Sequence, residues 1–115
     1  MFNSLNRSAV IITPKRSFFD MTAKISGDQP DKAAQPFSND ESTVYLIKET
    51  GLYEPTIKER LASCFKDIFY EELAGWFTNK SKWPKSITWK EFESWFHISF
   101  QSVVLDTIDE DIEHE

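Results

Sequence analysis

One thiol and two imidazoles are the side chains in this sequence best suited to covalent or metal chemistry. They belong to Cys64, His97 and His114, the only residues of their types. A thiol beside a histidine can act as a nucleophile, and the same groups can bind zinc. Cys64, however, falls on an apolar stripe at helical spacing, His97 stands between apolar residues, and His114 lies in a polar terminal segment. We therefore predict an unreactive thiol, no catalytic residue and no metal site.

The acidic segment 106–115 raises the question of calcium binding. An EF-hand loop needs a glycine at its sixth position and an acid at its twelfth, and this segment has no glycine. The three glycines, Gly27, Gly51 and Gly75, are scattered along the chain, so they form no loop that could cradle a phosphate. The sequence predicts a solvated acidic tail over 106–115, no cofactor and no enzyme activity.

A basic segment with two tryptophans could instead bind an anion. Trp83 and Trp89 stand among four lysines, beside a predicted helix start. Basic residues interleaved with aromatic rings can hold nucleic acid through phosphate pairing and base stacking. The competing interpretation is that Trp83 packs over the end of two helices while the lysines are solvated. The candidate anion-binding residues are Lys80, Lys82, Lys85 and Lys90.

The helix after this loop has a well-marked start. Thr88 and Glu91 have the spacing of a capping box, in which each satisfies an amide of the other. Ile87 and Phe92 stand where a hydrophobic staple would place them. Large apolar residues then recur at helical spacing. The pattern predicts a helix over 89–105.

A strand is the alternative for the second half of this segment. "FHISFQ" (96–101) alternates apolar and polar residues, as a strand paired with "VYLI" (44–47) would. The cap and the long apolar stripe favour the helix. On that helix Trp95, Ile98 and Leu105 fall outside the main apolar face.

A second helix is predicted over 55–78. Pro55 suits its first position, and Ile57, Leu61 and Cys64 begin an apolar face that continues at three- and four-residue steps. The helix should end either at Gly75 or near Asn79, since both residue types favour helix ends.

Outside these helices we expect little regular structure. "TVYLI" (43–47) is β-branched and aromatic, which predicts a short strand. Residues 1–42 contain prolines and many polar residues, which predicts a flexible arm. The first 19 residues lack acids, a feature of transit peptides, but Pro14 interrupts any amphipathic helix, so an untargeted cytoplasmic chain is the simpler interpretation.

Together these elements predict a mainly α domain over 43–105, in which the short strand precedes a helical hairpin from Pro55 to about Leu105, with the flexible arm before the domain. Two helices make a thin core, so we expect a second copy or a protein partner to complete it. The residues expected to contact that partner are Trp83, Trp95, Ile98 and Leu105.

Composition excludes further classes of function. The chain has 115 residues, is 40% hydrophobic, and carries a formal net charge of −6. This charge opposes general nucleic-acid binding, and no apolar run is long enough to span a bilayer. We predict a non-enzymatic protein-interaction or regulatory protein that acts through an aromatic helical surface. The alternatives are a nucleic-acid-associated protein that uses the loop 80–90 and an acidic mimic of nucleic acid.

Overall fold

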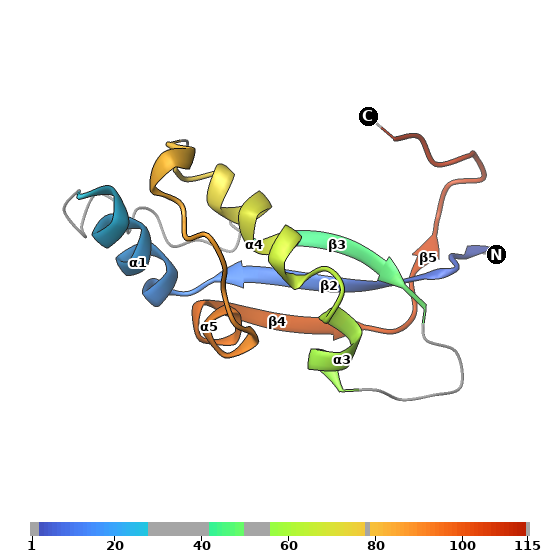
Figure 1. Cartoon of the computed structure of the whole chain (residues 1–115). Coiled ribbons are helices and arrows are strands. Elements are labelled where there is room, and N and C mark those ends of the chain that lie inside the picture. Colours follow the sequence, from blue (N-terminus) through green and yellow to red (C-terminus); the bar gives the residue numbers. More distant parts are fainter. Residues whose placement is uncertain (1–2, 28–41, 50–55, 78, 115) are drawn as a thin grey trace.

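The computed structural model describes residues 3–27, 42–49, 56–77 and 79–114, which form a mixture of helices and strands (Figure 1). In chain order the elements are β1 (Asn3–Ser4), β2 (Arg7–Pro14), α1 (Arg16–Ser26), β3 (Thr43–Lys48), α3 (Ile57–Leu61), α4 (Phe65–Ala74), the 3-10 helix η2 (Lys80–Lys82), α5 (Trp89–Trp95), β4 (Phe96–Gln101) and β5 (Leu105–Asp106).

The strand β2 is the centre of the fold. It lies between β3 and β4 in a three-stranded antiparallel sheet (Figure 1). Its sequence, RSAVIITP, is rich in β-branched residues, which favour strands. The register places Val10 opposite Tyr45 of β3 and Phe100 of β4. Pro14 occupies the last position, where a missing amide N–H disturbs the sheet least.

The core lies on one face of this sheet, against the helices. Val10 and Ile12 of β2 and Phe96 of β4 are buried on this face, because alternate residues of paired strands point the same way. Figure 1 shows α3 and α4 passing across the strands. The helical residues of the same core are Phe18, Phe19, Leu61, Phe65, Ile68, Phe69, Leu73 and Phe92.

The predicted helix over 89–105 is wrong beyond its second turn. α5 ends at Trp95, and the backbone of Phe96 is already extended, with φ −132° and ψ 143°. The alternation in "FHISFQ" therefore corresponds to a strand, in which Phe96 is buried while His97 is exposed. The strand alternative named the wrong neighbour, because β4 pairs with β2 and not with 44–47. A strand depends on its neighbours for stability, and β2 supplies the neighbour here.

The predicted mainly α fold and flexible N-terminal arm are also wrong. Residues 7–26 form β2 and α1, so the protein is an α+β fold built around a segment that was expected to be an arm. The cause is that the hydrogen-bond partners of β2 lie far away along the chain, in β3 and β4, where no local pattern reveals them. The remainder of the predicted arm, 28–41, lies outside the described residues.

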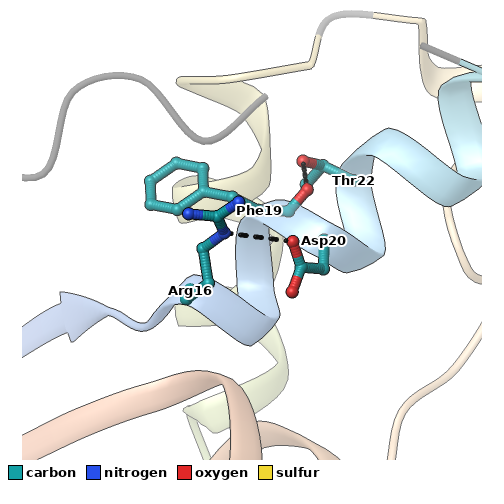
Figure 2. A network of polar contacts seen from close by, with 4 residues as sticks. All are labelled: Arg16, Phe19, Asp20 and Thr22. Carbon is teal, nitrogen blue, oxygen red and sulfur yellow. Dashed lines mark hydrogen bonds and ion pairs between the residues drawn. The ribbon is translucent and has the colours of Figure 1, made fainter. Parts of the chain in front are cut away.

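The helix α1 fixes one end of the sheet. It buries Phe18 and Phe19, whose rings meet edge to face with centroids 5.4 Å apart. Figure 2 shows Thr22, whose hydroxyl donates to the Phe19 carbonyl at 2.8 Å. The exposed ion pair between Arg16 and Asp20 in the same view, at 3.3 Å, contributes at most about 1 kcal/mol. Burial of the two rings therefore dominates the docking of α1.

The predicted helix over 55–78 is two helices. α3 begins with an unpredicted capping box between Thr56 and Glu59, and Cys64 leaves helical geometry before α4 begins. α4 ends at Ala74 with Gly75 as its C-cap, which confirms one of the two predicted ends. The strand predicted over 43–47 is confirmed as β3.

The capping box that starts α5 is also confirmed. The Thr88 hydroxyl accepts from the Glu91 amide, and the Glu91 carboxylate accepts from the Thr88 amide. Ile87 and Phe92 are both buried. At the far end of the domain, β5 pairs with β1, so the start of the acidic tail returns to the N-terminal segment.

Candidate functional site

The strand β3 is an edge of the sheet with an apolar outer face. Its inner edge pairs with β2, and no other strand among the described residues pairs with its outer edge. Alternation turns Tyr45 and Ile47 toward the core and turns Val44 and Leu46 away from it. Val44 is 60% exposed and Leu46 is 51% exposed. Among the described residues, β3 therefore has no strand beside its outer edge, and it exposes two large apolar side chains.

A hollow of about 410 Å³ runs between β3 and α4, and we refer to it as the β3–α4 groove. It is lined by Tyr45, Leu46, Ile47, Cys64, Asp67, Ile68 and Glu71. Three consecutive strand residues line it although their side chains alternate between the two faces. The groove must therefore follow the outer edge of β3, since the edge is the place that both faces share.

The helix contributes one face to the groove. Cys64, Asp67, Ile68 and Glu71 recur at three- and four-residue steps, the spacing that aligns side chains along a helix. Ile68 and, across the groove, Ile47 are buried and form an apolar floor. Asp67 and Glu71 are exposed and form an acidic rim. Among the described residues that line the groove there is no Lys, Arg or His.

A partly buried hydrogen bond joins β3 and α4, the two elements that line the groove. The Tyr45 hydroxyl donates to Oε2 of Glu72 at 2.5 Å, and Glu72 is only 6% exposed. Burial raises the pKa of the Glu72 carboxyl, although hydrogen bonds from Tyr45 and Thr43 oppose the shift. Burial and the bond to Glu72 also raise the pKa of Tyr45. The pair therefore joins β3 to α4 beside the groove.

The thiol in the groove is poorly suited to nucleophilic chemistry. Cys64 is half-buried, and burial, followed by the charge of Asp67, raises the pKa of its thiol. A thiol attacks as its thiolate, so a raised pKa lowers its reactivity at neutral pH. The histidines lie elsewhere: His97 is exposed on β4, opposite Thr13. The inert thiol stays a prediction.

Most of the residues expected to contact a partner pack against the core instead. Trp95 stacks on Phe69 with ring centroids 5.3 Å apart. Trp83 stacks on Tyr70 at 5.8 Å, and Ile98 is half-buried against the core. Leu105 alone of this set is exposed, in β5. These residues do not form one continuous exposed surface.

In the lysine-rich loop the charged side chains are exposed, whereas the aromatic rings pack within the fold. Lys80, Lys82, Lys85 and Lys90 are all exposed. The rings between them serve the fold: Trp83 donates from Nε1 to the Phe77 carbonyl at 2.9 Å, and Trp89 meets Phe65 edge to face at 5.5 Å. The loop thus keeps its positive charge accessible, whereas its rings are occupied and less available for base stacking.

The acidic tail forms no metal-binding cluster within the part of the chain that the structure describes, where no three His, Cys, Asp or Glu side chains gather suitably. Asp106 accepts instead from the Ile108 amide at 2.9 Å. None of the described helices combines the length and apolarity needed to cross a membrane.

The acidic rim and the Tyr45–Glu72 pair were not predicted from the sequence. Tyr45 was recognised as part of a strand, but the position of α4 beside that strand has no local signature. The spacing of Asp67 and Glu71, four residues apart and hence on one helix face, was the only available signal. The chain matches no protein-family model, no curated protein and no solved structure.

Proposed function

We propose that this chain is a non-enzymatic protein-interaction module that binds its partner along β3. One observation carries the proposal: β3 is an edge strand with Val44 and Leu46 exposed on its outer face. Unpaired strand edges readily accept a strand from another chain, and clustered apolar side chains on a surface often mark interfaces.

The proposed class of function is the one expected from the sequence, but the binding surface lies at β3 rather than on the aromatic helices. The aromatic helical surface is a weaker candidate, because Trp83 and Trp95 are stacked within the fold. The acidic tail, 106–115, would assist binding to a basic partner by speeding the first encounter at low salt.

The chemistry of the groove supports binding rather than catalysis. A catalytic thiol needs a lowered pKa or a neighbouring base. The pKa of Cys64 is raised, and no histidine is among the described residues that line its groove.

Site-specific photo-crosslinking of the full chain in its native cells tests the proposal. A benzophenone side chain at position 46 should yield one dominant adduct with a partner protein or with a second copy. The control is the same probe at Val103, which is 67% exposed but lies outside β3. Weak and heterogeneous labelling at both positions would contradict the proposal.

A further inference from the structure

We propose that the β3–α4 groove binds an extended segment of a partner protein that carries an arginine or lysine, and that this segment joins the sheet as a strand beside β3. The inference deepens the proposed function and rests on it. It specifies the conformation of the bound segment and the chemistry of its anchoring side chain.

The backbone of β3 favours an extended occupant. β3 is six residues long, and its outer edge has no strand beside it among the described residues. Strand addition supplies main-chain hydrogen bonds to such an edge, while pockets beside the edge select alternate side chains. The groove supplies a pocket of this kind, because it follows the edge past Tyr45, Leu46 and Ile47.

The lining of the groove favours a long cationic side chain. Its floor is apolar at Ile47 and Ile68, and its rim carries the carboxylates of Asp67 and Glu71. Lysine and arginine bury their aliphatic stems on apolar surface and keep their charged heads in water. A stem on the isoleucines would place its head at the rim. An arginine could contact both carboxylates, since its planar guanidinium has several donors.

Charge also argues against a second copy of the chain as the occupant. Pairing two β3 edges would bring the acidic rims of both copies to one seam, and like charges there oppose association. The whole chain has a formal net charge of −6, which adds to the repulsion. A basic segment of another protein has the complementary charge.

Selection from a random dodecapeptide phage library on the intact protein tests the chemistry of the occupant. Enriched peptides should contain a central arginine or lysine between β-branched residues. The winning peptide should bind a D67N/E71Q variant about five- to tenfold more weakly. A variant with the same loss of charge in the tail, E110Q/E113Q, should bind within about twofold of the unchanged protein.

Conformation is tested with the same peptide. Two versions of the peptide are N-methylated, one at the odd-numbered and one at the even-numbered backbone amides. Because only alternate amides of a bound strand face β3, one version should bind more weakly by about tenfold or more and the other should not. Thermal melts should show that D67N/E71Q remains folded. Enrichment of peptides without a basic residue, no enrichment at all, or equal losses for the two charge variants would overturn the inference. If crosslinking at position 46 still captured a partner, the proposed function would survive that failure.

Discussion

The two edge strands of the sheet, β3 and β4, share a partner and an alternating pattern but present opposite surfaces to solvent. Both pair with β2. The outward residues of β4 are His97, Ser99 and Gln101, whereas those of β3 are Val44, Leu46 and, at its end, Lys48. Polar outward residues protect an edge from unwanted pairing. The outward face of β4 is therefore polar, whereas that of β3 is apolar except at Lys48, which fits the proposed binding along β3.

The inward residues of β4 should show the largest effect on stability. Phe96 is 1% exposed, and its ring lies 4.9 Å from those of Phe18 and Phe92. Phe96→Ala should lower the free energy of unfolding by about 3–5 kcal/mol, measured by urea denaturation. The adjacent outward substitution, His97→Ala, should change it by less than about 0.5 kcal/mol. Similar losses for both would show that the assigned faces of β4 are incorrect.

Removal of the Tyr45 hydroxyl should weaken the attachment of β3. Tyr45→Phe leaves the buried Glu72 carboxyl without this donor, which should cost about 1–3 kcal/mol of unfolding free energy. Tyr70→Phe is the matched control, because the Tyr70 hydroxyl donates to the neutral Pro84 carbonyl at 2.6 Å. It should cost less, about 0.5–1.5 kcal/mol. A larger loss for Tyr70→Phe would contradict the proposed importance of the Tyr45–Glu72 pair.

The burial of Glu72 predicts a pH dependence of stability. Folding raises the pKa of Glu72, so the folded state holds this proton more tightly than the unfolded state does. The contribution to stability is therefore complete below the unfolded pKa of about 4.3 and is lost as pH rises through the folded pKa. Glu72→Gln should remove this decline. The free energy of unfolding of the variant minus that of the unchanged protein should therefore increase as pH rises above about 4.3.

This difference is measured by urea denaturation of both proteins across the acidic range. Subtracting the two curves removes the contribution of the other carboxyl groups, which both proteins share. A difference that stayed constant with pH, or that decreased as pH rose, would be inconsistent with a raised pKa of Glu72.

The outward residues of β3 should show the smallest effect on stability. Val44→Thr and Leu46→Thr each should change the unfolding free energy by about 0.5 kcal/mol or less, because both side chains are already exposed. The inward control on the same strand, Ile47→Thr, should cost about 1–3 kcal/mol because Ile47 is buried. Large losses at positions 44 and 46 would mean that these residues serve the fold rather than an interaction.

Local signals in the sequence predicted local structure well. The capping box at Thr88 and Glu91, the strand β3 and the end of α4 at Gly75 all depend on neighbours within a few residues. The pairing of β2 with β3 and β4 depends instead on residues far away along the chain, and it was not predicted. Without β2, the only partner considered for a strand over 96–101 was 44–47, and the cap and the apolar stripe favoured a helix instead.

The groove could not be predicted for the same reason. Its two sides come from β3 and α4, and their contact depends on the complete sheet and on the burial of Glu72 against Tyr45. The tryptophans show the reverse problem, since a sequence rich in rings does not reveal which rings the core will occupy. Trp83 and Trp95 were expected at a partner surface and are stacked on Tyr70 and Phe69.

Backbone amide NMR shifts, recorded while the crosslinked partner or the selected peptide is added, test the central claim most directly. We expect the amides of β3 to shift strongly and to become protected from hydrogen exchange, with smaller changes at Asp67 and Glu71. The amides of β4 and of the loop 80–90 should remain unchanged. Shifts confined to β4 or to that loop would contradict the assignment of β3 as the binding edge.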